Sequence, residues 1–259
     1  TMPIIRIINK LRHGLSWFVI NLMVLSAAMA CVIATFLFIR HELSYDRMHE
    51  KANRIYRVTT DSNRGATSIH PARVSGEWPQ RLVAEYPAIE KIVRMVPFRK
   101  AVVKIGNQSF FCQKAYSTDS SFFDLFDFKL ISGKSENTFA RPGRAIICES
   151  LARKYFGSTD VIGHEITIIH QQDPTPKNFI IDGVMEDFPD NSHFHAELLT
   201  SFTTAEERST WAYTYLLMKQ GTDVAALRND IQKNWKKINP ETVNIPILYF
   251  QPLTDIHLF

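Results

Sequence analysis

The sequence is poor in cysteine, and this excludes a fold that depends on a disulfide framework. Only three cysteines occur among the 259 residues: Cys31, Cys112 and Cys148. Small secreted domains that depend on disulfides carry several cysteine pairs. A single bridge between Cys112 and Cys148 stays open, but two buried free thiols are the favoured interpretation.

Motifs for nucleotide binding and nucleophilic catalysis are also missing. The chain has no G-x-x-x-x-G-K-[ST] loop, which excludes ATP binding through a P-loop, and no G-x-S-x-G elbow. It has no long run of Lys or Arg outside the N-terminal segment, and its net charge is only +4, so nucleic acid is not an expected partner. We therefore expect no catalytic residue and no cofactor.

One group of residues invites comparison with a metal site. His193 and His195 lie close in sequence to Glu186 and Asp187. Residues two apart share a face only on a strand, and this spacing matches no standard zinc pattern. A polar loop between strands is the better interpretation, and no metal is expected.

What the sequence does contain is one long apolar run, residues 17–39, with 23 residues and no charge. A helix needs roughly 20 apolar residues to cross a bilayer. The run is longer than a signal-peptide core and no small-x-small cleavage site follows it, so it predicts a retained transmembrane helix. Ser26 and Ala30 share a face on which another helix can pack, and Asn21 favours a polar partner there.

The segments on either side predict how the chain meets the membrane. Residues 1–15 form a basic amphipathic pattern that suits a helix in the membrane interface. The basic residues Arg6, Lys10 and Arg12 place the N-terminus in the cytoplasm and the large domain outside, in the periplasm of a bacterium.

Helix-favouring residues continue to about Ala52, so residues 16–51 are predicted to be the transmembrane helix and a helical stalk. Four polar residues of this stalk fall at helical spacing and are interpreted as a solvated face: His41, Asp46, His49 and Glu50.

The remaining residues, 52–259, mix short strands with a few helices and predict an α+β domain. The expected strands are 54–60, 89–96, 101–105, 108–116, 145–148, 165–170, 178–185, 198–202, 212–218 and 245–253. The expected helices are 75–85 with a cap at Ser75, one or two turns capped by Asp119, 150–156 ended by Gly157, and 223–238 capped by Asp223.

Four separated motifs give the chain a family resemblance. They are HELSYDRMHEKANRIYRVTT at 41–60, YSTDSSFF with FDFKL at 116–130, AIICESLARKYFG at 145–157, and DGVMEDFP with NSHF at 182–194, and the ending PLTDIHLF is similar too. In this order they resemble ABC-transporter permeases that carry a MacB-like periplasmic core domain and an FtsX-like permease module.

The resemblance implies a fold and a function. It implies two mixed α/β subdomains, a porter-like one of residues 52–105 and 196–259 and an inserted one of residues 106–195. It implies a permease dimer or pseudo-dimer in the inner membrane, driven by a separate cytoplasmic ABC ATPase, for export or work in the envelope, with a possible periplasmic partner. It also implies that the chain is part of a longer protein with further membrane helices after Phe259.

Two other classes of protein remain as alternatives. One is an extracytoplasmic sensor domain anchored by this span. It would be followed by a second span near Phe259 and then by a cytoplasmic signalling module. An anchored enzyme would hold a convergent polar cluster in a cleft. The four motifs favour the permease over both.

Overall fold

The computed structural model describes residues 2–61, 71–98, 100–135, 138–171, 173–205, 207, 210–240 and 245–258, with side chains from residue 17 onward. The chain divides into two compact units, residues 1–44 and residues 45–259. We describe each unit by itself.

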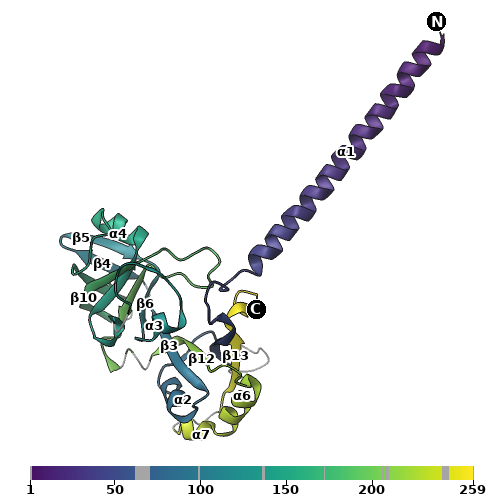
Figure 1. Ribbon diagram of the computed structural model, residues 1–259. Coiled ribbons are helices and arrows are strands. Elements are labelled where there is room, and N and C mark those ends of the chain that lie inside the picture. The colour runs from purple at the N-terminus through teal and green to yellow at the C-terminus, as the bar shows by residue number, and fades with distance from the viewer. Residues whose placement is uncertain are drawn as a thin grey trace. The chain divides into compact units, whose positions relative to one another are not determined.

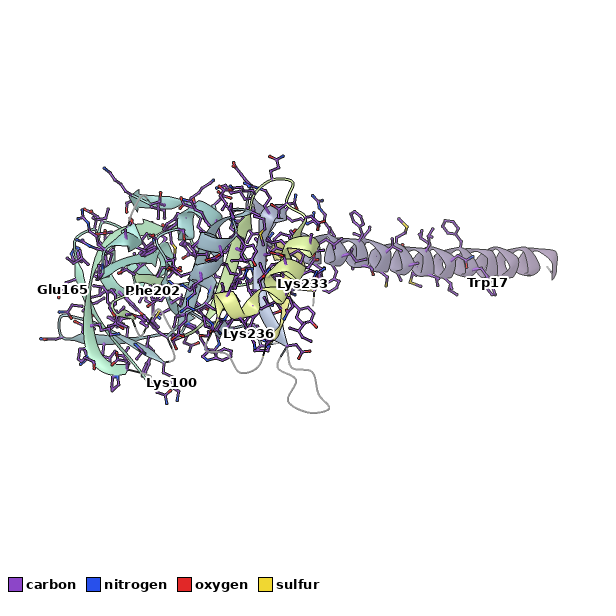
Figure 2. All side chains as sticks on the ribbon, turned by 90° about the horizontal axis from the view of Figure 1, so that it is seen from below. Trp17, Lys100, Glu165, Phe202, Lys233 and Lys236 are labelled. Atoms are coloured by element: carbon purple, nitrogen blue, oxygen red, sulfur yellow. The ribbon has the colours of Figure 1, made fainter. Side chains whose placement is uncertain are left out.

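The first unit is one continuous helix, α1 (Met2–Glu42). Its segment Trp17–Glu42 is long and apolar enough to cross a membrane, and its apolar window is not buried in protein. Trp17 illustrates this exposure in Figure 2. The predicted long apolar helix is therefore confirmed as a candidate membrane span. Residues 2–15 belong to the same unbroken helix, and their location in the membrane interface stays a prediction.

The predicted helical stalk is wrong for residues 43–51. Helix α1 ends at Glu42, and turns follow it up to the short 3-10 helix η1 (Ala52–Arg54). Asp46 has a φ of 56°, in the left-handed region that a right-handed helix excludes. The interpretation of Asp46 and His49 as a solvated face is also wrong, since both side chains are buried in the domain.

The second unit is a mixed α+β domain, as predicted. Its strands are β1 (Ile55–Asp61), β2 (Val74–Ser75), β3 (Ile89–Pro97), β4 (Ala101–Ile105), β5 (Gln108–Cys112), β6 (Ala115–Thr118), β7 (Leu130–Gly133), β8 (Arg144–Cys148), β9 (Glu165–His170), β10 (Asp173–Met185), β11 (Leu198–Ser201), β12 (Trp211–Met218) and β13 (Ile247–Pro252). Its helices are α2 (Pro79–Glu85), α3 (Phe122–Leu125), α4 (Glu149–Phe156), α6 (Val224–Lys233) and α7 (Trp235–Ile238), with 3-10 turns η2 (Thr138–Ala140) and η3 (Leu253–Asp255).

The described strands pair in the order β13-β1-β12-β3-β6-β11-β8-β10-β9-β4-β5. Strand β2 pairs with β12, and β7 pairs with β10. Most neighbours are antiparallel, but β10 runs parallel to β8 and β11 runs parallel to β6. Strands β13 and β5 therefore lie at the two ends of this order.

Helices cover the sheet at both of its ends. Figure 1 shows α2, α6 and α7 at the end that holds β3, β12 and β13, and α4 at the end that holds β4 and β5. The first group packs around Trp78 and Trp235, whose rings meet edge-on with centroids 4.7 Å apart. A larger core contains many aromatic rings around Phe122 and Phe126.

Several predicted boundaries shift. The predicted strand 108–116 is two strands, because the chain leaves the β4–β5 hairpin after Cys112 and β6 pairs with β3 and β11. The predicted helix 75–85 begins only at Pro79, since Ser75 lies in β2. The predicted helix 223–238 is interrupted at Asn234 and becomes α6 and α7.

The predicted cap at Asp119 is wrong, and those at Gly157 and Asp223 are confirmed. The Asp119 carboxylate binds Arg94 instead, and α3 has no side-chain cap. Gly157 ends α4 in the left-handed conformation, and Asp223 accepts a hydrogen bond from Ala226 N at 2.9 Å. The division of the domain into residues 52–105 with 196–259 and residues 106–195 stays a prediction.

Candidate functional site: the junction segment

Residues 45–51, which we call the junction segment, connect helix α1 to strand β1 through η1. The segment contains turns but no helix or strand. Side chains and backbone groups of distant loops hold it in place. Because it is the covalent link between the apolar helix and the domain, its attachment decides how firmly the domain's first strand is tethered.

Asp46 is the most deeply held residue of the junction segment, with none of its side chain exposed. Its backbone N–H donates to Asn191 O at 2.9 Å. Its Oδ1 accepts hydrogen bonds from Ser192 Oγ at 3.4 Å and from His193 N at 3.2 Å. The same Oδ1 lies 2.9 Å from Nδ1 of His193. The loop after β10 therefore encloses this carboxylate.

His193 links Asp46 to the sheet. Its Nε2 lies 2.8 Å from the hydroxyl of Tyr215, a buried residue of β12. Tyr215 is the cross-strand neighbour of Arg57 on β1, whose Nη2 donates to Gln251 Oε1 on β13 at 2.7 Å. These five residues form what we call the polar row: Asp46, His193, Tyr215, Arg57 and Gln251.

His49 anchors the other end of the junction segment. It is 2% exposed, and its ring meets the edges of Phe126 and Phe128 at centroid distances of 5.3 Å and 5.0 Å. Its Nδ1 accepts a hydrogen bond from Asp127 N at 3.0 Å. The Asp127 carboxylate in turn accepts from Glu50 N at 2.8 Å. Because Nδ1 is an acceptor, this histidine is neutral in the structure.

Burial governs the protonation of this region. It lowers the pKa of His193 below its ordinary range, and the Asp46 carboxylate opposes that shift. It lowers the pKa of His49 as well, against the attraction of Asp46 and Asp127. It raises the pKa of Tyr215, so the phenol keeps its proton. His193 Nδ1 lies 2.9 Å from Asp46 Oδ1 without the alignment of a hydrogen bond, and its Nε2 shares a hydrogen bond with the Tyr215 hydroxyl in which either group can donate.

The two ends of the domain meet at the junction segment. The rings of Tyr45 and His257 stack with centroids 3.4 Å apart and planes 2° apart. The turns η1 and η3 are also in contact, and Figure 1 shows the C-terminus beside the start of the domain. A displacement of residues 45–51 therefore reaches the last described turn of the chain directly.

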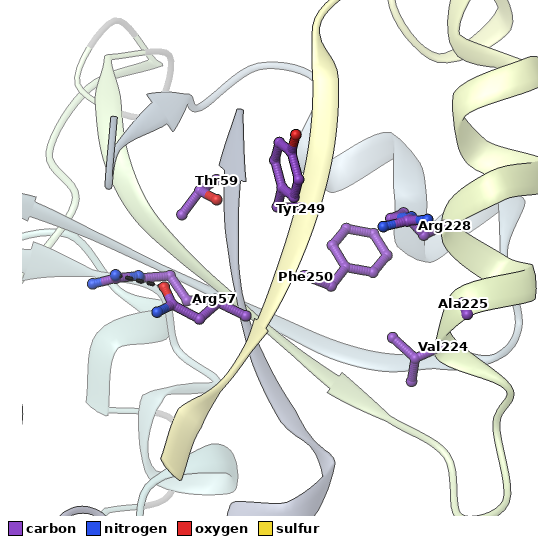
Figure 3. Close-up of a pocket in the computed structure, with 8 residues that line it drawn as sticks. Arg57, Thr59, Val224, Ala225, Arg228, Tyr249 and Phe250 are labelled. Atoms are coloured by element: carbon purple, nitrogen blue, oxygen red, sulfur yellow. Dashed lines mark hydrogen bonds between the residues drawn. The ribbon is translucent and has the colours of Figure 1, made fainter. Parts of the chain in front are cut away.

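A depression of about 560 Å³ surrounds the edge strand β13, but it is not an enclosed ligand cavity. Figure 3 shows that its lining lies on both sides of that strand, with Arg57, Thr59 and Tyr249 on one side and Phe250 and Arg228 on the other. The strand divides the space into two shallow halves, so this depression does not resemble a buried small-molecule site.

The residues compared with a metal site do not converge. His193 faces Asp46, whereas the Asp187 carboxylate accepts from Ser150 N at 3.1 Å. His195 is partly exposed, and Glu186 is exposed. Among the described residues, no group of three or more His, Cys, Asp and Glu side chains has an arrangement that could hold a metal.

The two domain cysteines are free and buried, which confirms the favoured interpretation. Burial and the nearby Glu197 carboxylate raise the pKa of Cys112 to about 12, and burial also raises that of Cys148. Both thiols therefore stay protonated and unreactive at neutral pH.

Sequence reasoning missed the junction segment as a site. It treated Asp46 and His49 as solvated and His193 as a loop residue. The sequence offered one indication of this site. His193 lies in the NSHF motif, and Asp46 and His49 lie in the first motif, at 41–60. Both motifs therefore contained polar residues without an assigned role.

Comparisons with known proteins support the fold. The family described as the MacB-like periplasmic core domain matches residues 18–234. No curated protein is similar enough in sequence to count as a relative.

Several solved structures resemble the chain, and three of them show the range of similarity. A domain assigned to a permease protein from Porphyromonas gingivalis has a TM-score of 0.64 and 22% identity, and the match covers 79% of this chain and 92% of that one. The periplasmic region of MacB from Actinobacillus actinomycetemcomitans has a TM-score of 0.57, 13% identity, and coverage of 80% and 92%. The extracellular domain of the noncanonic ABC-type transporter YknZ from Gram-positive bacteria has a TM-score of 0.54, 11% identity, and coverage of 76% and 99%.

At these identities the solved structures establish the fold alone, and the family match extends over most of the sequence. The confirmed apolar helix, the mixed α/β domain and the match over residues 18–234 lead to the same conclusion. The chain belongs to the family of permease proteins with a MacB-like periplasmic core domain.

Proposed function

We propose that this chain is the permease subunit of an ABC transporter and couples ATP hydrolysis on a separate cytoplasmic ATPase to movement of its external domain. The family match supports the permease class. The transmembrane segment Trp17–Glu42 supports a membrane location. In this proposal the N-terminus is cytoplasmic, the domain is periplasmic, and the subunit works as a dimer in the inner membrane.

The observation that carries the coupling role is the attachment of the junction segment. An anchored enzyme can function on a flexible tether, because its tether has no displacement to transmit. Here residues 45–51 are fastened by buried contacts from Asp46 to the loop at 191–193 and from His49 to Asp127. Such an attachment is suited to transmitting displacement from a membrane helix to a sheet.

The proposal assigns no chemistry to the chain itself. Hydrolysis takes place on the partner ATPase, and this subunit needs only to change shape. The aromatic cluster around Phe122, including Phe126, Phe128 and Phe194, then serves to keep the domain rigid on the side that receives the junction segment.

The first experiment is a pull-down of the tagged full-length gene product from membranes in mild detergent, followed by mass spectrometry. We expect an ABC ATPase in near-stoichiometric amount. Recovery of a signalling kinase instead of an ATPase would overturn the proposal in favour of a sensor.

A second experiment tests force transmission in the recovered complex. A Gly-Ser-Gly-Ser insertion after Ser44 should uncouple the domain, so that ATP turnover no longer changes the mobility of a spin label on the domain. The same insertion in the exposed β4–β5 turn, between Gly106 and Asn107, is the matched control and should preserve the response. An unchanged response after the Ser44 insertion would contradict transmission through this segment.

A further inference from the structure

We propose that the polar row and His49 form an acid-released latch, in which protonation of His49 and His193 frees the junction segment from the domain. This inference rests on the contacts of residues 45–51 and goes beyond the proposed transport function. The latch requires only that this segment links a membrane helix to the domain, whatever the function of the whole protein.

The contact of His49 cannot survive protonation. Its Nδ1 accepts the backbone N–H of Asp127 at 3.0 Å. A protonated imidazole carries a hydrogen on both nitrogens, so Nδ1 would place a donor against a donor that cannot turn away. The ring must then move, and with it the part of the junction segment that Glu50 N holds to the Asp127 carboxylate.

The contact of His193 changes in the same direction. Its Nε2 lies 2.8 Å from the Tyr215 hydroxyl and its Nδ1 lies 2.9 Å from Asp46 Oδ1. Protonation places a hydrogen on both ring nitrogens and a full charge in a site where 4% of the side chain is exposed. The Asp46 carboxylate alone must compensate for that charge in place of water.

The charges around the latch oppose taking up two protons. Facing His193 are Asp46 and His49 from the junction segment, Arg57 from β1, Tyr215 from β12 and His195 from its own loop. Facing His49 are Asp46, Asp127 and His193. At neutral pH this group contains one positive charge, on Arg57, and two negative charges, on the carboxylates of Asp46 and Asp127. When the histidines of this group are charged, the positive charges outnumber the two carboxylates, and the buried cluster repels itself.

The sign of the pH dependence follows from these contacts. Burial lowers the pKa of His49 and of His193 in the closed latch. Once released, the two imidazoles return to an ordinary pKa of about 6.5 and bind protons more readily. The closed state is therefore favoured at neutral pH and is lost as the pH falls below about 6.5, and two coupled sites make that loss steep.

The latch can open without unfolding the sheet, because the junction segment has no strand partner. Asp46 sits at a φ of 56°, in the left-handed region, which aspartate adopts more readily than most non-glycine residues but still at a conformational cost. Among the described atoms, Asp46 Oδ2, His49 Nε2 and His193 Nδ1 are buried without a hydrogen-bond partner. Release returns these groups to water, which reduces the cost of opening.

The test measures the mobility of a spin label at residue 48 in the full chain, reconstituted in nanodiscs. Met48→Cys places the label on an exposed position of the junction segment, and Cys31→Ala removes the exposed native thiol. We expect the mobile fraction to rise by about threefold or more between about pH 7.5 and about pH 5, and to return on neutralisation. A label at Ser109→Cys, exposed on β5, should not respond and reports that the domain stays folded.

Histidine variants identify the groups responsible. The double variant His49→Gln with His193→Gln should lose the pH response, whatever its resting mobility. His170→Gln should retain it, because His170 lies outside the groups that face His49 and His193. The proposal is overturned if the wild-type label does not respond to acid, or if the response persists undiminished in the double variant.

Discussion

Arg94 shows how a single buried charge is accommodated inside the sheet. Its side chain is 3% exposed, and its Nε and Nη2 donate to the two carboxylate oxygens of Asp119 at 2.9 Å and 2.7 Å. Its Nη1 donates to Gly76 O at 2.9 Å, and its guanidinium lies 5.3 Å from the Phe202 ring centroid. Asp119 is thus the counter-ion of a buried cation and not a helix cap.

At this scale we predict that Asp119→Ala destabilises the domain by about 3 kcal/mol or more, because it leaves the Arg94 charge buried and unpaired. The matched control is Asp124→Ala, five residues away. Asp124 pairs with Lys91 at 2.6 Å, but both side chains are nearly half exposed, so the loss should stay within about 1 kcal/mol. Urea denaturation of the full chain in nanodiscs measures both, and equal losses would refute the prediction.

Among the secondary-structure elements, helix α6 supplies a side chain that satisfies backbone groups at the edge strand β13. Gln232 Nε2 donates to Pro246 O at 2.8 Å, and its Oε1 accepts from Leu248 N at 2.9 Å. The side-chain amide therefore takes the place of a neighbouring strand. An edge with satisfied backbone groups is a poor template for pairing with another chain.

We predict that Gln232→Ala loosens β13 without unfolding the domain. Loss of two hydrogen bonds at a strand edge is worth about 1 to 2 kcal/mol, which corresponds to roughly tenfold faster amide exchange at Leu248. Hydrogen exchange resolved to that amide measures the effect. Lys233→Ala, at the exposed neighbouring position, should leave the exchange rate unchanged. Unaltered protection in Gln232→Ala would show that the helix does not stabilise this edge.

At the scale of the whole molecule, the two buried thiols report on global opening. Cys112 and Cys148 lie in the larger core, with 1% and 2% of their surfaces exposed. Both thiols interact with Tyr155 of α4, so a reagent reaches them only when this part of the core opens.

In a Cys31→Ala background we predict that a maleimide labels the native chain at least roughly 100-fold more slowly at neutral pH than the urea-unfolded chain. Mass spectrometry of timed samples counts the labelled thiols. The label should also appear on both cysteines together. Rapid labelling of one thiol in the native chain would show that part of the core opens independently.

Much of the architecture was predictable from local patterns. The transmembrane helix depends only on a continuous apolar run, since transfer into lipid is a property of the segment itself. The ends of α4 and α6 depend on Gly157 and Asp223, whose effect is confined to one helical turn. Most strands followed from alternating or β-branched runs, with boundaries that shifted by a few residues.

The junction segment was not predictable in this way. Its residues 43–51 have good helix propensity, yet the helix ends at Glu42 because tertiary contacts are stronger than that preference. Nothing in the local pattern says that a histidine will be enclosed by Phe126 and Phe128, which lie more than seventy residues further along the chain.

A long apolar helix and an α+β domain of this family could be predicted from the sequence alone, because hydrophobic length and the order of motifs are patterns along the chain. That Asp46 and His193, 147 positions apart, share one buried site is visible only in the folded structure. The physical reason is that the burial of a polar group, and with it its pKa and its partners, depends on which distant segments exclude water from it.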